Sequence, residues 1–332
     1  MVYAAGGGYG HCVRAISLAR AAKKENKKRK VALVANQSAV TRLASIARSS
    51  QIELFGLNDA CSVQSFRDQS KQLLSRLRFS SLIVDSFPRG IVGELTDVIS
   101  AREYSKVLVH RDISPDYLNK TPVAKAISHF CLILVPGEPA PLANDEKAIR
   151  TTPWVLLDSS ELFSRCEAHE VLRIADSGMP VCLISLSGKE HERVFFSRIA
   201  LKLVKELGDK IQFKVCGDVP DIWQQELKSI SVKYWPLLKL LGGVDWLIGA
   251  GGYNTVFESK LAGAKFFGFP QERLYDRQRR RIDNKNLYTD PDVLISDLKA
   301  LRGTWASDAS RHRNQIRYKN GVHRAVQEIA KL

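Results

Sequence analysis

The residues from 248 to 281 combine a glycine-rich turn, an acid and a polar loop. A strand predicted at 244–248 runs into this turn, and either Asn254 or Thr255 is expected to cap the helix that follows. Such a turn presents backbone N–H groups that have no intrahelical partner, together with the positive end of a helix dipole. Both favour the binding of a phosphate. The residues concerned are Gly249, Gly251, Gly252, Asn254 and Thr255.

Glu258 lies one helical turn after Asn254, on the same side of the predicted helix. An ionised carboxylate only accepts hydrogen bonds, so beside a phosphate it suits a vicinal diol such as a ribose. After a second strand at 265–269, Asp276 and Gln278 add polar groups from a loop. A purely structural explanation needs only close-packed glycines and a glutamate favoured by the helix dipole. The order of acid, strand and polar loop favours a nucleotide-sugar site instead.

A second glycine-rich loop, at residues 6–11, follows the first predicted strand. It departs from the dinucleotide fingerprint because His11 stands where the third glycine belongs, and the next strand ends in Ala35-Asn36 without an acid. No Gly-Lys-Ser/Thr closes the loop, so it is not a P-loop either. These departures argue against a dinucleotide oxidoreductase.

His11 is a candidate general base, because an imidazole titrates near neutral pH. The alternative is a histidine that only caps or packs. Arg14 helps to decide between them, since a cation near a helix start opposes the dipole and is expected to meet an anion or a carboxylate. The loop with Gly8 and Gly10, together with His11 and Arg14, is therefore interpreted as the acceptor or phosphate side of a site.

Two further motifs favour structural roles. His110-Arg111-Asp112 imitates a kinase catalytic loop, but the other kinase motifs are missing. Asp290-Pro291-Asp292 imitates a metal-binding motif, yet it stands where a turn and a helix cap are expected. No cluster of histidines and cysteines has metal-ligand spacing, so the sequence predicts no metal site and no cofactor.

The chain has 332 residues, 45% of them hydrophobic and 26% charged, with a formal net charge of +15. Two domains are expected at this length. The positive charge gathers in residues 23–30, 273–281 and 311–319, three separate clusters that argue against a continuous nucleic-acid groove. The first cluster is expected to be a solvated cap at the end of a helix.

The chain also lacks the marks of an exported or membrane-spanning protein. No apolar run is long enough to span a bilayer, and the start does not resemble a signal peptide. The six cysteines are scattered and are expected to be reduced and mostly buried. The sequence therefore predicts a cytoplasmic protein, with peripheral contact to an anionic membrane left open.

Strands and helices alternate along the chain in two series, which predicts two Rossmann-like, doubly wound α/β domains. The first series has strands at 2–5, 30–35, 52–55, 81–85, 107–110 and 131–135, and a helix at 64–78. The second has strands at 181–186, 211–215, 232–234, 244–248 and 265–269, and a helix at 192–207. The polar stretch 151–160 separates them. We expect an N-terminal domain at 1–155, a second domain at 156–310, and a basic helix over 311–330 that packs back on the N-terminal domain.

Three motifs in order point to a family. G-G-G-Y-G-H-x-x-R at 6–14, G-G-Y-N-T-x-x-E at 251–258 and D-x-Q at 276–278 resemble GT-B glycosyltransferases. The nearest resemblance is to the MurG-like group (glycosyltransferase family 28), which contains the peptidoglycan N-acetylglucosaminyltransferase. The first motif also resembles the UDP-sugar hydrolase of pseudaminic acid synthesis. The resemblance implies two facing Rossmann-like domains, with the nucleotide-sugar in the second.

The resemblance also implies roles for individual residues. Glu258 corresponds to the acid that binds the donor ribose, Gln278 to the residue that reads the sugar hydroxyls, and His11 to the histidine near the acceptor. Trp235 lies in the segment that recognises the base, usually uracil. The full set of expected donor-binding residues is Gly8, Gly10, Arg14, Ser187, Gly188, Trp235, Gly251, Gly252, Asn254, Thr255, Glu258, Asp276 and Gln278.

These observations lead to one main hypothesis and two alternatives. The main one is an inverting, metal-independent glycosyltransferase that uses a UDP-sugar. His11 would be the base, and helix amides, with Arg14 or Arg277, would offset the diphosphate charge. The acceptor stays open between a small molecule, a glycan and a lipid-linked sugar. The alternatives are a nucleotide-sugar hydrolase and a basic protein that binds nucleic acid or an anionic membrane, although nucleic acid is not expected.

Overall fold

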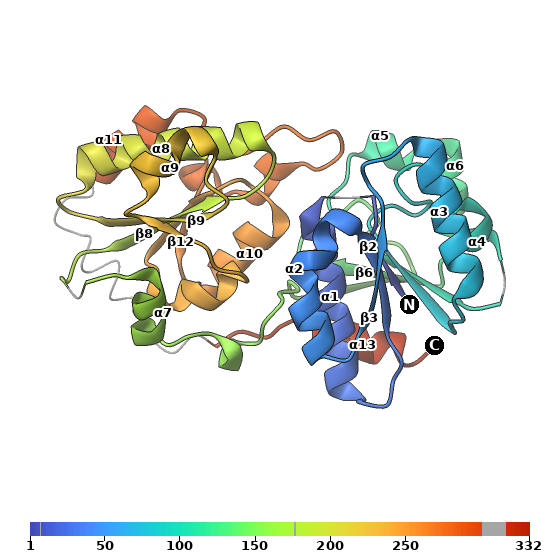
Figure 1. Cartoon of the computed structure of the whole chain (residues 1–332). Helices are drawn as coiled ribbons and strands as arrows, with labels where there is room; N and C mark the ends of the chain where they lie inside the picture. The colour runs from blue at the N-terminus through green and yellow to red at the C-terminus, as the bar shows by residue number, and fades with distance from the viewer. Residues whose placement is uncertain (7, 102, 176, 301–316) are drawn as a thin grey trace. The chain divides into compact units, whose positions relative to one another are not determined.

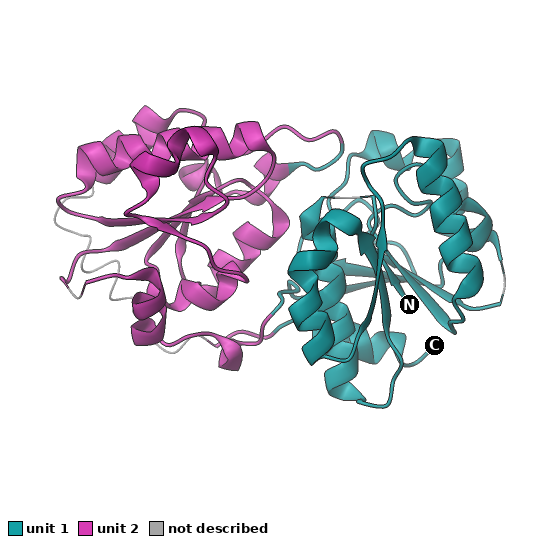
Figure 2. Ribbon diagram, viewed as in Figure 1, with its two compact units in different colours: residues 1–156, 275–277, 320–332 teal, residues 157–274, 278–319 magenta. Residues whose placement is uncertain are grey.

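The structure of the chain is a computed structural model, and it describes residues 1–6, 8–101, 103–175, 177–300 and 317–332. The chain divides into two compact units (Figure 2). Unit 1 comprises Met1–Leu156, Tyr275–Arg277 and Asn320–Leu332, and unit 2 comprises Leu157–Leu274 and Gln278–Lys319. The acceptor and donor roles expected for the two halves of the chain stay predictions.

Unit 1 is built on a parallel sheet that has seven strands in the described residues (Figure 1). The strand order is β3-β2-β1-β4-β5-β6-β7, and every neighbouring pair is parallel. The central strands are continuous apolar runs, as expected of strands covered on both faces. Their bounds are β1 Val2–Tyr3, β2 Ala32–Asn36, β3 Glu53–Leu57, β4 Ser81–Asp85, β5 Ser105–Val109, β6 Leu132–Pro136 and β7 Ala148–Thr151.

Helices cover both faces of this sheet. One face packs against α3, α4 and α6, whose buried side chains join those of the strands in one core. On the other face α1 packs against α2 and α13, and α13 also contacts β6 and β7. The bounds are α1 Tyr9–Glu25, α2 Gln37–Ser49, α3 Val63–Arg76, α4 Thr96–Ser100, α5 Pro115–Leu118, α6 Thr121–Ser128 and α13 Val322–Ile329.

Unit 2 repeats the plan on a smaller scale. Its parallel sheet has the order β10-β9-β8-β11-β12 in the described residues. The strands are β8 Val181–Leu186, β9 Gln212–Gly217, β10 Ser231–Val232, β11 Trp246–Gly249 and β12 Lys265–Gly268. The α-helices are α7 Arg165–Leu172, α8 Glu190–Leu207, α9 Gln224–Leu227, α10 Tyr253–Ala262 and α11 Pro291–Ala300, and the 3-10 helices are η1 Ser159–Glu161, η2 Asp221–Trp223, η3 Leu237–Gly243, η4 Gln278–Arg281 and η5 Asn284–Asn286.

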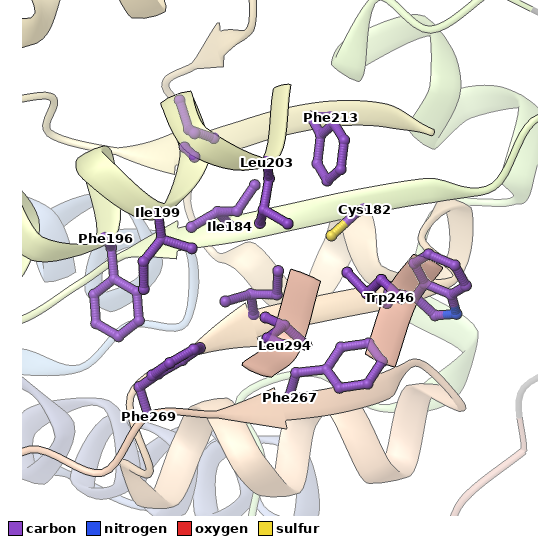
Figure 3. Packing of buried hydrophobic residues seen from close by; sticks show 14 of the residues in the cluster. Cys182, Ile184, Phe196, Ile199, Leu203, Phe213, Trp246, Phe267, Phe269 and Leu294 are labelled. Atoms are coloured by element: carbon purple, nitrogen blue, oxygen red, sulfur yellow. The ribbon is translucent and has the colours of Figure 1, made fainter. Parts of the chain in front are cut away.

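The core of unit 2 lies between its sheet and the helices α8 and α11 (Figure 3). Aromatic rings from three elements meet there, with Phe196 of α8 6.3 Å from Phe269 and Trp246 of β11 6.1 Å from Phe267, measured between ring centroids. This packing fixes β11 and β12, the strands that carry the glycine-rich turn and the polar loop.

The doubly wound α/β fold predicted from the sequence is confirmed, and most of the predicted strands are present within one or two residues of their expected ends. Three details are wrong. Strand β10 ends at Val232 rather than 234, so Tyr234 lies outside it. Residues 317–320 are not helical, and the first part of the helix predicted from 311 lies outside the described residues. Of the six cysteines only three, Cys12, Cys182 and Cys216, are buried.

Each sheet has a point where the chain reverses its direction of progress across the sheet. In unit 1 it lies between β1 and β4, and in unit 2 between β8 and β11. Ligands of such sheets bind beyond the carboxyl ends of the strands at this switch point.

Within the described residues, no helix has both the length and the apolar character needed to cross a membrane.

Candidate functional site

The switch point of unit 1 holds a histidine–carboxylate pair. His11 lies in the first turn of α1, just after β1, and Asp85 is the last residue of β4. His11 Nδ1 is 2.5 Å from Asp85 Oδ2. The side chain of His11 is 16% exposed, whereas that of Asp85 is only 1% exposed. Helix α1 begins at Tyr9, so Gly10 and His11 belong to the helix and not to the loop, where the sequence placed them.

Arg14 binds both oxygens of the same carboxylate, including the Oδ2 that His11 contacts. Its Nε donates to Asp85 Oδ1 at 2.7 Å and its Nη2 to Asp85 Oδ2 at 2.6 Å, with a further bond to Ser86 Oγ at 3.2 Å. This bidentate geometry is the strongest that an arginine and a carboxylate can form. The expectation that Arg14 meets an anion or a carboxylate is confirmed, and the side chain of Arg14 is 0% exposed. Its predicted contact with the donor remains untested.

The pKa values of this pair follow from burial and charge. Burial would raise the pKa of Asp85, but Arg14 and His11 outweigh it and hold that pKa well below its usual range. Burial lowers the pKa of His11 below 6.5, and Asp85 opposes this only in part. An ionised Asp85 accepts the Nδ1 proton of a neutral His11, which leaves Nε2 as a free acceptor for a proton. This arrangement is that of an oriented general base.

Asp85 is a functional candidate that the sequence reasoning missed. The only signal was a predicted strand that ends in an acid. Its neighbour Ser86 is a buried non-glycine residue with φ of 68°, a conformation that is rare outside glycine. Phe87 then stacks on the ring of His11, with 5.4 Å between ring centroids. The end of β4 thus positions the carboxylate, and the turn after it places the Phe87 ring beside His11.

Asp276, expected to bind the donor, lies in a part of unit 1 rich in ion pairs. Its Oδ1 accepts a hydrogen bond from Arg111 Nη2 at 3.2 Å, and its backbone forms an isolated bridge with Ile113. The adjacent Arg277 is paired with Asp112. These contacts give residues 111 and 112 structural roles, as the sequence suggested. They also show that the carboxylate of Asp276 already has a cationic partner.

The switch point of unit 2 contains the glycine-rich turn. Helix α10 begins at Tyr253, and its N-cap is Gly252, with no capping hydrogen bond from a side chain of the described residues. The prediction that Asn254 or Thr255 caps the helix is therefore wrong. Both lie inside the first turn, because Gly252 already has the extended conformation of an N-cap (φ −65°, ψ 148°). A helix start without a side-chain cap leaves its amides to a ligand or to water.

Close packing explains one glycine of the turn but not its neighbour. A Cβ on Gly251 would lie 2.9 Å from Ile282 Cδ1 and 3.0 Å from the Gln278 carbonyl oxygen. A Cβ on Gly252 would meet only Thr255 Oγ1, at 4.0 Å. Gly251 is therefore required for packing, whereas the space beside Gly252 is open.

Glu258 is the most unusual residue of unit 2. It lies on α10, is only 6% exposed, and its carboxylate has no hydrogen-bond donor among the described residues. Burial raises its pKa to about 8. A buried carboxyl group normally finds a partner, since an unmade hydrogen bond costs about 1–3 kcal/mol. Once it is ionised, Glu258 therefore offers two carboxylate oxygens that accept no hydrogen bond from the described residues, as a pair of ligand hydroxyls would need.

Gln278 is buried at the start of η4 and contacts the loop that follows β12. Its Oε1 accepts the N–H of Gln271 at 2.9 Å, while its Nε2 has no acceptor in the part of the chain that the structure describes. Three residues later Arg281, also buried, donates to the Gly251 carbonyl oxygen at 2.9 Å. Gln278 and Arg281 therefore pack against the glycine-rich turn at Gly251. The amide nitrogen of Gln278 remains able to donate a hydrogen bond to a ligand.

Ser187 and Gly188 are exposed at the carboxyl end of β8, the other strand of the switch point. Gly188 has φ of 101°, and a Cβ there would lie 1.7 Å from Glu192 Oε2. Glu192 is fully buried, accepts the Lys189 N–H at 2.9 Å and pairs with Arg273 through a 2.8 Å bond from Nη2. Burial would raise the pKa of Glu192, but Arg273 and the Lys189 amide keep it lowered.

Glu192 and Arg273 were not singled out in the sequence, and no motif marks them. They fix the loop at 187–188 to the segment after β12.

Trp235, expected near a base, is half-buried and is followed by a cis peptide bond to Pro236. Within the described residues no group of three or more His, Cys, Asp or Glu side chains could hold a metal ion.

Each unit therefore has polar residues at its own switch point. Unit 1 holds an oriented base that can take a proton from a hydroxyl group. Within the described residues, unit 2 holds a helix start without a side-chain cap and, one turn further on, a buried glutamate that has no hydrogen-bond donor; this combination suits a phosphate next to a diol.

No protein-family model matches the chain, and no curated protein matches it significantly. Solved structures do match it over 99% of its length. One is the glycotransferase of kitacinnamycin, which has 14% sequence identity to this chain; the match covers 97% of the glycotransferase, with a TM-score of 0.65. Another is the spinosyn rhamnosyltransferase SpnG complexed with thymidine diphosphate, with 14% identity, 99% of SpnG covered and a TM-score of 0.63. A third is a putative UDP-N-acetylglucosamine 2-epimerase from Listeria monocytogenes, with 10% identity, 94% of that protein covered and a TM-score of 0.65. The chain has the two-Rossmann-domain fold of GT-B proteins.

Proposed function

We propose that this protein is a nucleotide-sugar-dependent glycosyltransferase with a UDP-sugar as its donor. The observation that carries the proposal is Glu258, a buried carboxylate without a hydrogen-bond donor in the described chain, one turn into the helix that leaves the switch point of unit 2. The ribose of a nucleotide would supply two hydroxyl donors at this position. Among the structural relatives, SpnG was solved with a nucleoside diphosphate.

The remaining donor contacts follow from the elements around Glu258. The amides at the start of α10 would face the diphosphate, with Gly252 giving it room to approach the backbone. Ser187 and Gly188 lie at the end of the neighbouring strand β8 and would approach the same phosphates. Gln278 Nε2, which has no acceptor among the described residues, would donate a hydrogen bond to a sugar hydroxyl. Trp235 is assigned to the base only through the family resemblance.

Unit 1 would supply the base. His11 Nε2 takes the proton of an acceptor hydroxyl while the oxygen attacks the anomeric carbon of the sugar. The bond from that carbon to the diphosphate breaks, and the nucleoside diphosphate leaves with the electron pair. A single displacement of this kind inverts the anomeric centre. Asp85 stabilises the imidazolium that forms, as a carboxylate does in other oriented histidine bases.

The charge of the leaving diphosphate has to be offset as it develops. Arg14 and Arg277 are each paired with a carboxylate of unit 1, Asp85 and Asp112. The amides at the start of α10 are therefore the better candidates, because preorganised N–H groups stabilise developing charge. The proposal predicts that turnover continues when a chelator removes divalent cations.

Transfer and hydrolysis differ only in what His11 deprotonates, so one incubation separates them. The protein is incubated with a panel of UDP-sugars, with and without a mixture of sugar and lipid-linked acceptors, and the release of UDP and of free sugar is followed. UDP release that requires an acceptor supports transfer. Free sugar in equal amount to UDP without an acceptor indicates a hydrolase. UDP release that is unchanged in His11→Ala would refute the role of His11.

A further inference from the structure

A cluster of three aromatic rings lies beside His11 in unit 1. Phe87 stacks on the imidazole, with 5.4 Å between the ring centroids and 24° between the ring planes. Tyr117 meets Phe87 edge-on at 5.6 Å between centroids. Tyr275 lies 6.2 Å from Phe87 and 4.6 Å from Tyr117, again between centroids. Each ring of the cluster therefore contacts the other two, and Phe87 connects the cluster to His11.

Three separate parts of the chain supply these rings. Phe87 lies in the turn after β4, and Tyr117 belongs to α5. Tyr275 comes from residues 275–277, a short segment from the second half of the sequence that is part of unit 1 (Figure 2). Phe87 and Tyr117 are only 8% and 7% exposed, whereas Tyr275 is half-buried. Because closely packed side chains have few rotamers open to them, the two tyrosines restrict the Phe87 ring.

The segment that carries Tyr275 is itself held in place. The Ser114 N–H donates to the Tyr275 carbonyl oxygen at 2.9 Å. Asp276 and Ile113 form an antiparallel bridge, and the side chains of residues 276 and 277 are both ion-paired. The position of the Tyr275 ring is therefore set by backbone and side-chain contacts of its own segment.

We propose that Tyr275 is a positioning residue for His11 and acts through Phe87. The inference rests on the proposed role of His11 as the base. Asp85 fixes the imidazole at Nδ1, and Phe87 lies against one face of the ring. A base is efficient only when its reacting atom is held in place, since a displacement of about 1 Å can cost about 100-fold in rate. Tyr275 would keep the Phe87 ring against the imidazole and so help to hold Nε2 in place.

The same packing affects the protonation of His11. Burial lowers the pKa of His11 below 6.5, Asp85 opposes this in part, and Arg14 and Arg111 lower it further. The Phe87 ring contributes to this burial. A Phe87 ring that moved away would let water reach the imidazole, and the pKa of His11 would rise. Loss of positioning would therefore be visible in a titration of His11 as well as in the rate.

The test compares Tyr275→Leu with Tyr275→Phe in the full chain. Leucine removes the ring, whereas phenylalanine removes only the hydroxyl group. The pKa of His11 is measured by NMR without substrate, and its signals are assigned by comparison with His11→Gln. We expect this pKa to rise in Tyr275→Leu and to stay unchanged in Tyr275→Phe. In Tyr275→Leu, kcat with a UDP-sugar is expected to fall about tenfold, with an unchanged KM for the acceptor.

A second pair of variants tests the path through Phe87. Phe87→Leu should raise the pKa of His11, and adding Tyr275→Leu should raise it no further, because residues that act in one path are not additive. The matched control is Tyr104→Leu, which removes a half-buried ring from its 4.7 Å contact with Phe79 elsewhere in unit 1. This control should leave the pKa of His11 unchanged. Tyr275→Met repeats the first comparison with a more adaptable side chain, in case Tyr275→Leu does not fold.

Several results would overturn the proposal. They are an unchanged pKa of His11 in a folded Tyr275→Leu or Tyr275→Met, an equal rise in the Tyr104→Leu control, and additive rises in the double variant. A higher KM for the acceptor with an unchanged kcat and an unchanged pKa of His11 would make Tyr275 an acceptor contact instead. A wild type that turns over no UDP-sugar contradicts the proposed function, and the NMR comparison still decides whether Tyr275 positions His11.

Discussion

Replacing Glu258 by glutamine tests the most unusual feature of unit 2. The substitution keeps the shape of the side chain and removes its ionisation. In the folded protein, burial raises the pKa of Glu258 from 4.5 to about 8. The unfolded chain therefore loses this proton above about pH 4.5, whereas the folded chain keeps it up to about pH 8. The wild type must lose stability as the pH rises between these values, because its unfolded state is favoured by the earlier ionisation.

The size of the effect follows from the pKa difference. At 1.36 kcal/mol per pH unit, a change from 4.5 to about 8 corresponds to about 5 kcal/mol. Glu258→Gln and the wild type should have similar stability near pH 4.5, and the variant should become the more stable one up to pH 8. For a unit of this size the difference in melting temperature would be of order 10 °C.

Thermal unfolding followed by circular dichroism from pH 5 to pH 9 measures this difference. The exposed Glu226→Gln, also in unit 2, is the matched control and should follow the wild type at every pH. A constant difference between Glu258→Gln and the wild type across the range would contradict the raised pKa expected of a buried Glu258 that has no hydrogen-bond donor among the described residues.

Two further predictions concern single contacts. Asp85→Asn removes the charge that pairs with the buried Arg14. It should cost about 3–5 kcal/mol in urea unfolding and reduce turnover; a loss below about 1 kcal/mol would argue against the pair. Gly251→Ala should cost about 1–3 kcal/mol because its Cβ meets Ile282 and Gln278 at 3.0 Å or less. Gly252→Ala should leave stability within about 0.5 kcal/mol and weaken nucleotide binding; equal destabilisation by both glycine variants would refute the packing argument.

The fold could be predicted because each strand is recognisable by itself. Apolar runs such as 81–85 and 181–186 lie between glycines and polar turns, and strands alternate with helices. The position of the glycine-rich turn after β11 follows from the same local pattern. The details of the turn could not be predicted from this pattern. Gly252 has the backbone conformation of the N-cap, so Asn254 and Thr255 lie inside the helix.

The contacts of the candidate site depend on the order of the strands, which the sequence does not state. His11 and Asp85 are 74 residues apart and meet only because β1 and β4 are neighbours in the sheet. Asp276 and Arg111 are 165 residues apart, and no motif links them. Among the described residues Glu258 has no hydrogen-bond donor, and this depends on its packing, so it could be found only in the structure.

The most direct test of the central claim is a calorimetric titration of the protein with UDP at about pH 8, where the proposed ribose contact can be an ionised carboxylate. We expect saturable binding by the wild type and a loss of at least tenfold in affinity in Glu258→Gln, with 2′-deoxy-UDP binding the wild type more weakly than UDP. Equal affinity of wild type and Glu258→Gln for UDP, or no binding of UDP by the wild type, would contradict it.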